Sequence, residues 1–163
     1  MNNTGIIRKI DNLGRIVLPK ELRYNFNINA GDDFEISIDG NKIILTKYSK
    51  VMNYENEILK IIKTFNENIS FKIYMIVQNT LLGTQDKIDE GLNRMLQERK
   101  IIKNISSNKL TDNIVLEENN ILFPIIRNSD ILGALISVGH ENVNNMESIL
   151  KILSNLIINK IVE

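Results

Sequence analysis

The sequence contains no cysteine, no tryptophan and a single histidine, His140. Without cysteine the chain cannot form disulfides, a thiolate nucleophile or a cysteine-ligated metal site. One histidine leaves no histidine-rich metal site and little scope for histidine-based acid–base catalysis. We therefore expect neither a metal nor a cofactor. His140 follows an expected strand, and we interpret it as an exposed loop residue.

Long apolar runs are also missing from the chain. No run approaches the roughly 20 residues that span a bilayer, and the first residues, MNNTGIIRKID, lack the apolar core of a signal peptide. We expect a cytoplasmic protein without a membrane partner. Hydrophobic residues make up 43% and charged residues 25% of the chain, which is typical of a folded globular protein.

No constellation of residues indicates an enzyme. A glycine-rich phosphate loop is absent from the sequence. The acidic pairs Asp32-Asp33 and Glu117-Glu118 are adjacent, and neighbours in a strand point to opposite faces, so neither pair forms a catalytic dyad. We assign no catalytic residue.

The formal net charge is zero, but the charges are unevenly distributed. Residues 1–25 hold five cations and two acids, a net charge of +3, whereas residues 26–50 carry −1 and the remainder −2. A basic N-terminal segment in an otherwise acidic chain indicates that residues 1–25 bind an anionic partner. A basic surface that contacts only solvent would have the same composition.

The first 26 residues predict two strands and a short helix. TGIIRKID (4–11) is rich in β-branched residues and is followed by a turn, DNLG. RIVLP (15–19) has contiguous apolar residues, which predicts a strand buried on both faces. Pro19 suits the start of a helix, so PKELRYNF (19–26) is expected to form one or two helical turns.

Residues 33–48 predict a β-hairpin. In DFEISID, the alternation places Phe34, Ile36 and Ile38 inward. Asp39-Gly40 is a strong hairpin signal because type I′ turns require positive φ at both central residues. NKIILTKY (41–48) then returns as the partner strand.

Four strands and a helical turn in about 50 residues bury too little surface to fold alone. No disulfide or metal stabilises them, so oligomerisation is the remaining device. We infer an obligate dimer in which strands of two chains complete one barrel, which also duplicates its cations.

The segment TGIIRKIDNLGRIVLPKELR closely resembles the N-terminal domain of the AbrB family of transition-state regulators, and the similarity continues through FEISIDGNKIILTKY. The resemblance implies an intertwined, swapped-hairpin homodimer for residues 1–50 that binds double-stranded DNA. It also implies a regulator that acts at the nucleoid.

The resemblance assigns DNA-binding roles to five cations. Direct DNA contacts are expected from Arg8, Arg15 and Arg23, and phosphate contacts from Lys9 and Lys20. The family usually has a second arginine after Arg23, where this chain has Tyr24, so that contact is not carried over. Tyr24 either stacks or packs.

Each of these cations also has a purely structural interpretation. Arg8 is in phase with apolar neighbours and could extend its aliphatic stem over the barrel. Arg15 could cap the turn beside Gly14, Arg23 could pair with Glu21 or Asp11, and Lys20 could simply be solvated.

Residues 54–163 predict a second domain of α+β class, ordered helix–strand–helix–hairpin–helix. The first helix has an apolar seam from Tyr54 to Ile69, and FKIYMIV (71–77) is a strand with one apolar face. TQDKIDEGLNRMLQERK (84–100) predicts a second helix, with Ile88, Leu92, Met95 and Leu96 in phase. NILFPIIRNSDILGALISVG (120–139) predicts a hairpin with an edge or bulge at Pro124. The apolar positions of the last helix are Met146, Ile149, Leu150, Leu153, Leu156, Ile157 and Ile161.

The order of these elements, and the hairpin PIIRNSDILGALISV, resemble a small GAF domain with an α/β/α arrangement. The segment QNTLLGTQDK is shorter than the full second strand usual in GAF domains, which implies a reduced or absent ligand pocket. An unidentified small-molecule ligand is one expectation for this domain. The apolar faces of the first and last helices either cover their own sheet or pair with a second copy, and the resemblance implies pairing into a tetramer.

Together the two resemblances imply a transcription regulator of sporulation genes. Two other functions remain open. An antitoxin could use the same N-terminal fold to bind its operator and an extended tail to neutralise a toxin. Alternatively, the protein could be a small-molecule sensor whose basic face binds another protein.

Overall fold

The computed structural model describes residues 5–26, 28–84, 86–106, 109–128, 130–139 and 142–162. Thr4, Ser129 and His140 lie outside the described residues, so the expectations for them are not addressed. The chain divides into two compact units, Met1–Tyr48 and Ser49–Glu163.

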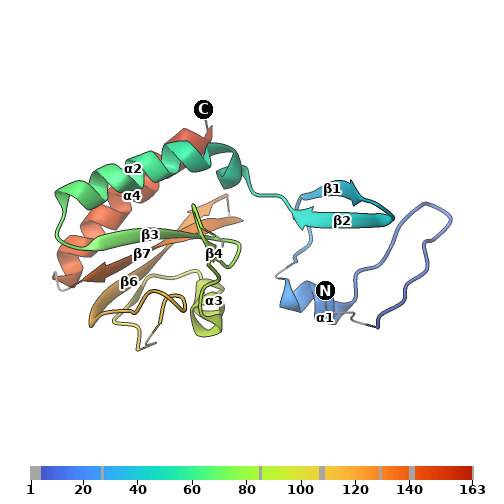
Figure 1. Ribbon diagram of the computed structural model, residues 1–163, viewed down its shortest axis with the longest axis horizontal. Helices are drawn as coiled ribbons and strands as arrows, with labels where there is room; N and C mark the ends of the chain where they lie inside the picture. Colours follow the sequence, from blue (N-terminus) through green and yellow to red (C-terminus); the bar gives the residue numbers. More distant parts are fainter. Residues whose placement is uncertain are drawn as a thin grey trace. The chain divides into compact units, whose positions relative to one another are not determined.

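The first unit contains one short helix and one hairpin, α1 (Lys20–Asn25), β1 (Phe34–Asp39) and β2 (Lys42–Lys47) (Figure 1). The strands pair antiparallel from Phe34↔Lys47 to Asp39↔Lys42. Gly40 has a φ of 56°, as the tight turn requires. The predicted helical turn and hairpin are confirmed. The type I′ turn centred on Asp39-Gly40 is not, because Asp39 pairs with Lys42 as the last residue of β1 and only Gly40 of the central pair Gly40-Asn41 has a positive φ.

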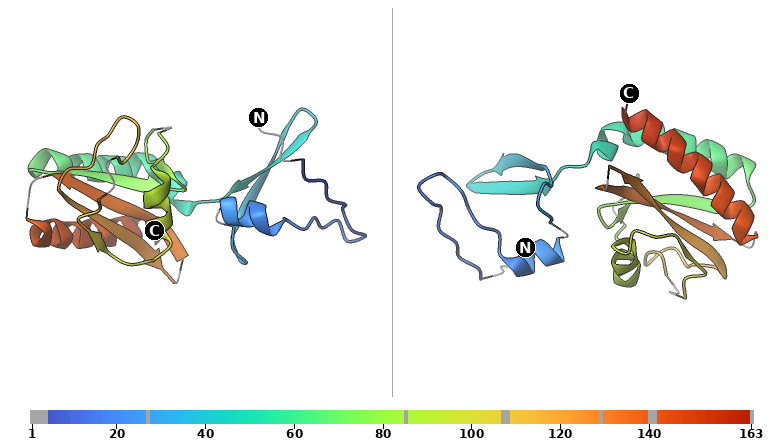
Figure 2. Two further views of the ribbon diagram at one scale, coloured as in Figure 1. Left: turned by 90° about the horizontal axis from the view of Figure 1, so that it is seen from below. Right: turned by 180° about the vertical axis from the view of Figure 1, so that it is seen from behind.

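The two strands predicted before α1 are not formed within one chain. The described residues 5–11 and 15–19 carry no ladder and run as two arms joined by a turn (Figure 2). Within the turn, the Asp11 N–H donates to the Arg15 carbonyl at 3.0 Å, and the Gly14 N–H donates to the Asp11 carbonyl at 3.0 Å. A strand forms only beside a second strand, and among the described residues neither arm lies in a ladder with one.

The apolar residues of the first unit are exposed. Among its described residues, only Pro19 is buried. Ile36 and Ile38 were expected to face inward, yet they are 68% and 80% exposed, and Val17 is 74% exposed. The inward prediction is therefore wrong for a single chain. The sequence pattern is that of a buried face, but one copy supplies nothing to bury it against.

The second unit contains a five-stranded sheet of order β4-β3-β7-β6-β5, and every described pairing in it is antiparallel. The predicted α+β class is confirmed. Its elements are η1 (Lys50–Tyr54), α2 (Glu55–Asn68), β3 (Lys72–Val77), β4 (Thr80–Leu81), α3 (Glu90–Leu96), β5 (Ile102–Lys103), β6 (Asn119–Arg127), β7 (Asp130–Gly139) and α4 (Val143–Val162).

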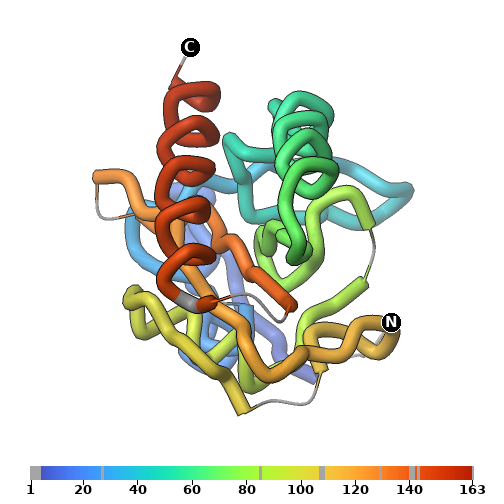
Figure 3. The backbone as a smooth tube through the Cα atoms, turned by 90° about the vertical axis from the view of Figure 1, so that its left-hand side faces the viewer, coloured from blue at the N-terminus to red at the C-terminus, as the bar shows by residue number. Residues whose placement is uncertain are grey.

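Helices cover both faces of this sheet. Helices α2 and α4 lie side by side on one face, and α3 lies on the other (Figures 2 and 3). Ile73 and Met75 of β3 face α2 and α4, whereas Ile76 packs with Leu92 and Leu96 on the α3 side. The period-two alternation of each strand thus builds two apolar cores.

Most elements of the second unit agree with the sequence analysis. Helix α2, β3, the β6–β7 hairpin and α4 are confirmed, and a register irregularity falls between Ile125 and Ile126, next to Pro124. Leu156, one of the apolar positions predicted for the last helix, is 43% exposed and so does not cover the sheet of its own domain.

Helix α3 is shorter than predicted for 84–100. Lys87 instead forms a bridge with Thr80, and the Ile88 N–H donates to the Asn79 carbonyl at 2.9 Å. The helix starts only after Asp89, whose side chain accepts the Gly91 N–H at 2.8 Å. The N-cap therefore fixes the start of the helix, although the apolar spacing extends further back.

The segment after Tyr48 belongs to the second unit. Residues 51–53 were assigned to neither predicted domain, but they lie within the 3-10 helix η1. Val51 within it is fully buried in the core with α2 and α4.

The Asn66 side chain closes part of an open sheet edge. Strand β3 pairs with β4 only at Ile76 and Val77, which leaves the earlier part of that edge without a strand. The Asn66 Oδ1 accepts the Ile73 N–H at 2.8 Å, and its Nδ2 donates to the Ile73 carbonyl at 2.9 Å. The amide thus makes the two hydrogen bonds that a neighbouring strand would supply.

Replacing Asn66 with alanine should lower the free energy of unfolding of the second unit by about 1–3 kcal/mol, because both Ile73 backbone groups lose their partner. Urea denaturation followed by circular dichroism measures this effect. Thr64→Ala is the matched control on the same helix, since Thr64 bonds only its own helix at Lys60, and it should stay within about 0.5 kcal/mol. Equal stability of Asn66→Ala and Thr64→Ala would contradict the role given to the amide.

Candidate nucleic-acid interface

The five cations singled out in the sequence lie in the first unit, and all are exposed. Arg8 and Lys9 are on the first arm, Arg15 directly follows the turn, and Lys20 and Arg23 are on α1. Arginine offers a planar fork of donors and lysine a compact charge, and both suit phosphate oxygens.

Arg15 is the cation of the five that forms an ion pair within the described residues. Asp11 Oδ1 accepts the backbone N–H of Leu13 and that of Arg15, each at 2.9 Å. Asp11 Oδ2 accepts from Arg15 Nε at 2.8 Å. The ion pair of Asp11 is therefore with Arg15, not with Arg23, and the Arg15 side chain remains 70% exposed.

These contacts change the titration of Asp11. Hydrogen bonds from the Arg15 backbone, the Arg15 guanidinium and the Leu13 backbone lower the pKa of the Asp11 carboxyl, while slight desolvation opposes them. A lowered folded-state pKa contributes stability above the ordinary pKa of aspartate, and this contribution is lost as the pH falls through the folded-state value. The turn is therefore fully braced at neutral pH.

The other cations are held loosely. Arg8 Nη1 donates to the carbonyl of its neighbour Ile7 at 3.3 Å. Within the part of the chain that the structure describes, no ion pair is formed by Lys9, Lys20 or Arg23. Their charges therefore face solvent, where an anionic partner can reach them.

Tyr24 stands on α1 beside Arg23 and is 79% exposed. Of the two interpretations given to it, packing does not occur within one chain. An exposed phenol beside a cation remains available for stacking or for a hydrogen bond.

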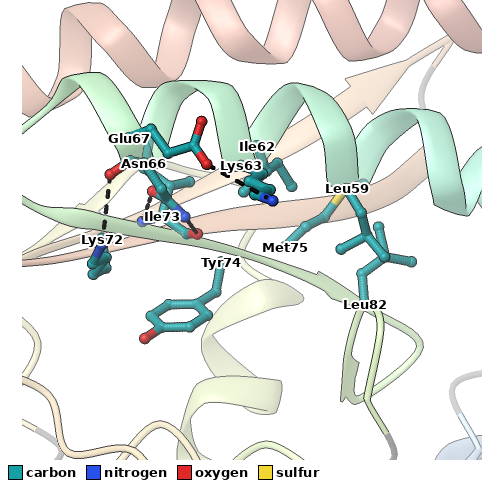
Figure 4. A pocket seen from close by; sticks show the side chains of 10 residues that line it. All are labelled: Leu59, Ile62, Lys63, Asn66, Glu67, Lys72, Ile73, Tyr74, Met75 and Leu82. Atoms are coloured by element: carbon teal, nitrogen blue, oxygen red, sulfur yellow. Dashed lines mark hydrogen bonds and ion pairs between the residues drawn. The ribbon is translucent and has the colours of Figure 1, made fainter.

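A groove between α2 and β3 is a second candidate site, which the sequence analysis missed (Figure 4). Its volume is about 320 Å³, and Leu59, Ile62 and Met75 contribute to its apolar lining. Lys63 and Lys72 also line it, and Lys63 lies 3.8 Å from Glu67. In the sequence these lysines look like ordinary surface cations, and only the fold brings them to one groove.

Two negative findings concern the described residues alone. They contain no group of three or more acidic, histidine or cysteine side chains arranged to hold a metal ion. None of their helices is both long enough and apolar enough to cross a membrane.

Comparison with known proteins first gives the class of the N-terminal unit. The family described as "Antidote-toxin recognition MazE, bacterial antitoxin" matches residues 7–52. The transition state regulatory protein AbrB of Bacillus subtilis (strain 168) is 52% identical over 52 residues, which are 32% of this chain and 54% of that protein. The predicted AbrB-like N-terminal domain is thus confirmed.

One relative spans both units. Stage V sporulation protein T of Bacillus subtilis (strain 168) is 29% identical over an alignment of 149 positions, which covers 83% of this chain and 84% of that protein. The chain is therefore a homologue of stage V sporulation protein T along most of its length. It combines an AbrB/MazE-like N-terminal domain with a second domain of α+β class.

Proposed function

We propose that the protein is a homo-oligomeric, DNA-binding transcription regulator of sporulation-related genes. The observation that carries the proposal is the exposure of Arg8, Lys9, Arg15, Lys20 and Arg23 on one AbrB-like unit. The similarity to proteins named for sporulation and for the transition state gives the biological context. The chemistry required is charge neutralisation and positioning on a duplex rather than catalysis.

The DNA-binding form is a dimer in which two copies of residues 1–50 interlock as a swapped-hairpin barrel. The arms, which belong to no strand ladder in the described part of the chain, and the exposed apolar face of the hairpin support this arrangement. In it, the arms gain ladder partners from the second chain, and the hydrophobic effect stabilises the barrel. The dimer presents each of the five cations twice. Two equivalent sets of cations match the two equivalent backbones of a DNA duplex.

Binding to duplex DNA should depend steeply on salt. If the dimer neutralises about six to eight phosphates, the logarithm of the association constant should fall with the logarithm of the salt concentration at a slope of roughly −5 to −7. Gel-shift or fluorescence anisotropy titrations between about 50 and 200 mM salt measure the slope. A slope near zero, or no binding at low salt, would contradict the proposal and favour a sensor whose basic face binds protein.

The second unit, which we propose to be GAF-like, joins two such dimers into a tetramer. Helix α4 carries Ile152 and Leu156 one turn apart, and they are 56% and 43% exposed. A second copy of α4 could cover them, and two coupled barrels would bind DNA with greater avidity. Native mass spectrometry counts the copies, and an assembly of no more than two would contradict this arrangement.

A regulatory ligand is the finer part of the proposal. The groove beside Lys63 and Lys72 would suit a small anionic molecule with an apolar body. Thermal-shift screening with metabolite-like carboxylates tests it, and no stabilisation by any of them would remove the groove as a sensing site.

The antitoxin alternative is favoured by the description of the matching family, but it expects an extended tail after the first unit. Residues 49–163 instead contain a sheet with two packed apolar cores. That architecture favours a regulator. Limited proteolysis distinguishes them, because a folded second unit resists cleavage and an extended tail does not.

A further inference from the structure

We propose that Asp11 is a positioning residue that aims the guanidinium of Arg15 at a base edge and thereby sets the sequence preference of the protein. This inference rests on the proposed DNA-binding function. It concerns the part of that function which separates one DNA sequence from another.

The geometry of the turn supports the assignment. Asp11 divides its two oxygens between two tasks. Oδ1 holds the backbone of the turn through the Leu13 and Arg15 N–H groups, and Oδ2 holds the guanidinium through Nε at 2.8 Å. One carboxylate therefore fixes both the backbone position of Arg15 and the orientation of its guanidinium plane.

The remaining donors of Arg15 are the ones that read DNA. A guanidinium has five N–H donors in a planar fork, and with Nε engaged the two terminal nitrogens keep four of them. Among the described residues, Arg15 makes no hydrogen bond through these terminal nitrogens. Two parallel donors at the end of a rigid plane match O6 and N7 of guanine in the major groove.

The charge of Asp11 acts in the same direction. A carboxylate beside Arg15 partly cancels its attraction for phosphates, which are the same in every sequence. The same carboxylate weakens binding to a base edge much less, because recognition there depends on directed hydrogen bonds. Asp11 therefore lowers sequence-independent binding while it prepares the sequence-dependent contact. Without the Asp11 ion pair, the Arg15 guanidinium would be free to bind the nearest phosphate.

The test compares two 30-base-pair duplexes, one enriched from a random library by the wild-type protein and one with the same base composition in scrambled order. The full chain is titrated with both, and the specificity ratio is the Kd for the scrambled duplex divided by the Kd for the selected one. Asp11→Asn keeps an oxygen that can accept the turn N–H groups, but its amide NH₂ cannot accept from Arg15 Nε.

Asp11→Asn should lower the specificity ratio by about tenfold, the size of one good base contact. Its affinity for the scrambled duplex should be retained or increased. The salt slope should steepen by up to about 2 per dimer, because each released Arg15 can neutralise another phosphate. If both affinities fell by the same factor, Asp11 would have only a structural role and the proposal would be overturned.

Two further variants keep the test decisive. In an Arg15→Ala background, adding Asp11→Asn should leave the ratio unchanged within about twofold, because a residue that acts through Arg15 has nothing left to position. A further fall would contradict the proposal. Arg15→Lys retains the positive charge but lacks the planar guanidinium, so its specificity ratio should fall while its affinity for the scrambled duplex is kept. This variant can be measured even if Asp11→Asn fails to fold.

Asp39→Asn is the matched control, because it removes the same charge from the exposed hairpin turn of the same unit. Its ratio should equal that of the wild type. A wild-type protein that binds neither duplex would contradict the proposed function itself. A wild-type protein that discriminates between them while Asp11→Asn discriminates equally well would overturn only the role of Asp11.

Discussion

Replacing Ile36 with aspartate is expected to abolish the barrel dimer and, with it, DNA binding. Ile36 pairs with Leu45, and Ile38 pairs with Ile43, so the four side chains share one face of the hairpin. Ile36 is 68% exposed in a single chain, where a charge would be harmless. In the proposed interlocked dimer the same side chain would be buried, and an unpaired charge there would cost several kcal/mol.

The measurement is native mass spectrometry of the full chain together with hydrogen exchange of the β1 and β2 amides. In wild type these amides should be protected within the barrel, and in Ile36→Asp they should exchange freely. The tetramer should fall to a dimer held by the second unit, and the Kd for DNA should rise by at least about 100-fold, the equivalent of roughly 3 kcal/mol.

Ser37→Asp is the matched control for this substitution. Ser37 is the next residue on the same strand, is exposed, and points to the opposite face of the hairpin. It should leave assembly intact. If Ile36→Asp assembled and bound DNA as well as Ser37→Asp does, the apolar face would not be an interface.

Arg15→Ala should weaken DNA binding by about 1–3 kcal/mol, or roughly 5- to 150-fold, and leave the oligomer intact. The side chain is 70% exposed, and its hydrogen-bond partner among the described residues is Asp11, so its removal takes away little packing. Anisotropy titration gives the affinity, and sedimentation gives the oligomeric state.

Lys60→Ala controls for the loss of one positive charge. Lys60 is exposed on α2 of the second unit and should change the affinity by less than about twofold. Unchanged affinity in a folded Arg15→Ala variant would remove Arg15 from the interface and would require another cation to carry the contact.

The elements of the second unit could be predicted because each buries its apolar side against its own chain. The spacing of Ile58 and Ile62 on α2 and of Leu150, Leu153 and Ile157 on α4 matches their burial directly. Helix α3 was predicted too long, since apolar spacing does not register the competition between a helix and the bridge that Lys87 forms with Thr80.

The first unit shows a different limit of sequence analysis. Its apolar pattern describes an environment that one copy of the chain does not contain. Residues 5–11 and 15–19 have β-branched content but no ladder, and Ile38 has the alternation of a buried residue but is 80% exposed. Periodicity records which residues are buried, but not which chain buries them.

For the candidate site, the cations could be identified from sequence, but their local partners could not. Arg15 was assigned both to DNA and, alternatively, to turn capping, whereas the structure gives the capping to Asp11 and leaves the Arg15 donors outward. An aspartate four residues before an arginine is common, and only the turn geometry makes the pair informative. The groove at Lys72 depends on the approach of α2 to β3, which no local pattern encodes.

The burial of Val51 has a consequence for how the two halves of the chain work together. Only Ser49 and Lys50 separate Tyr48, the last residue of the first unit, from a side chain anchored in the second unit's core. At full extension this tether spans about 10 Å. If two chains interlock as proposed, this short tether would keep their second units close together, at an effective concentration on the millimolar scale. Even a weak binding site between the two second units would then be largely filled.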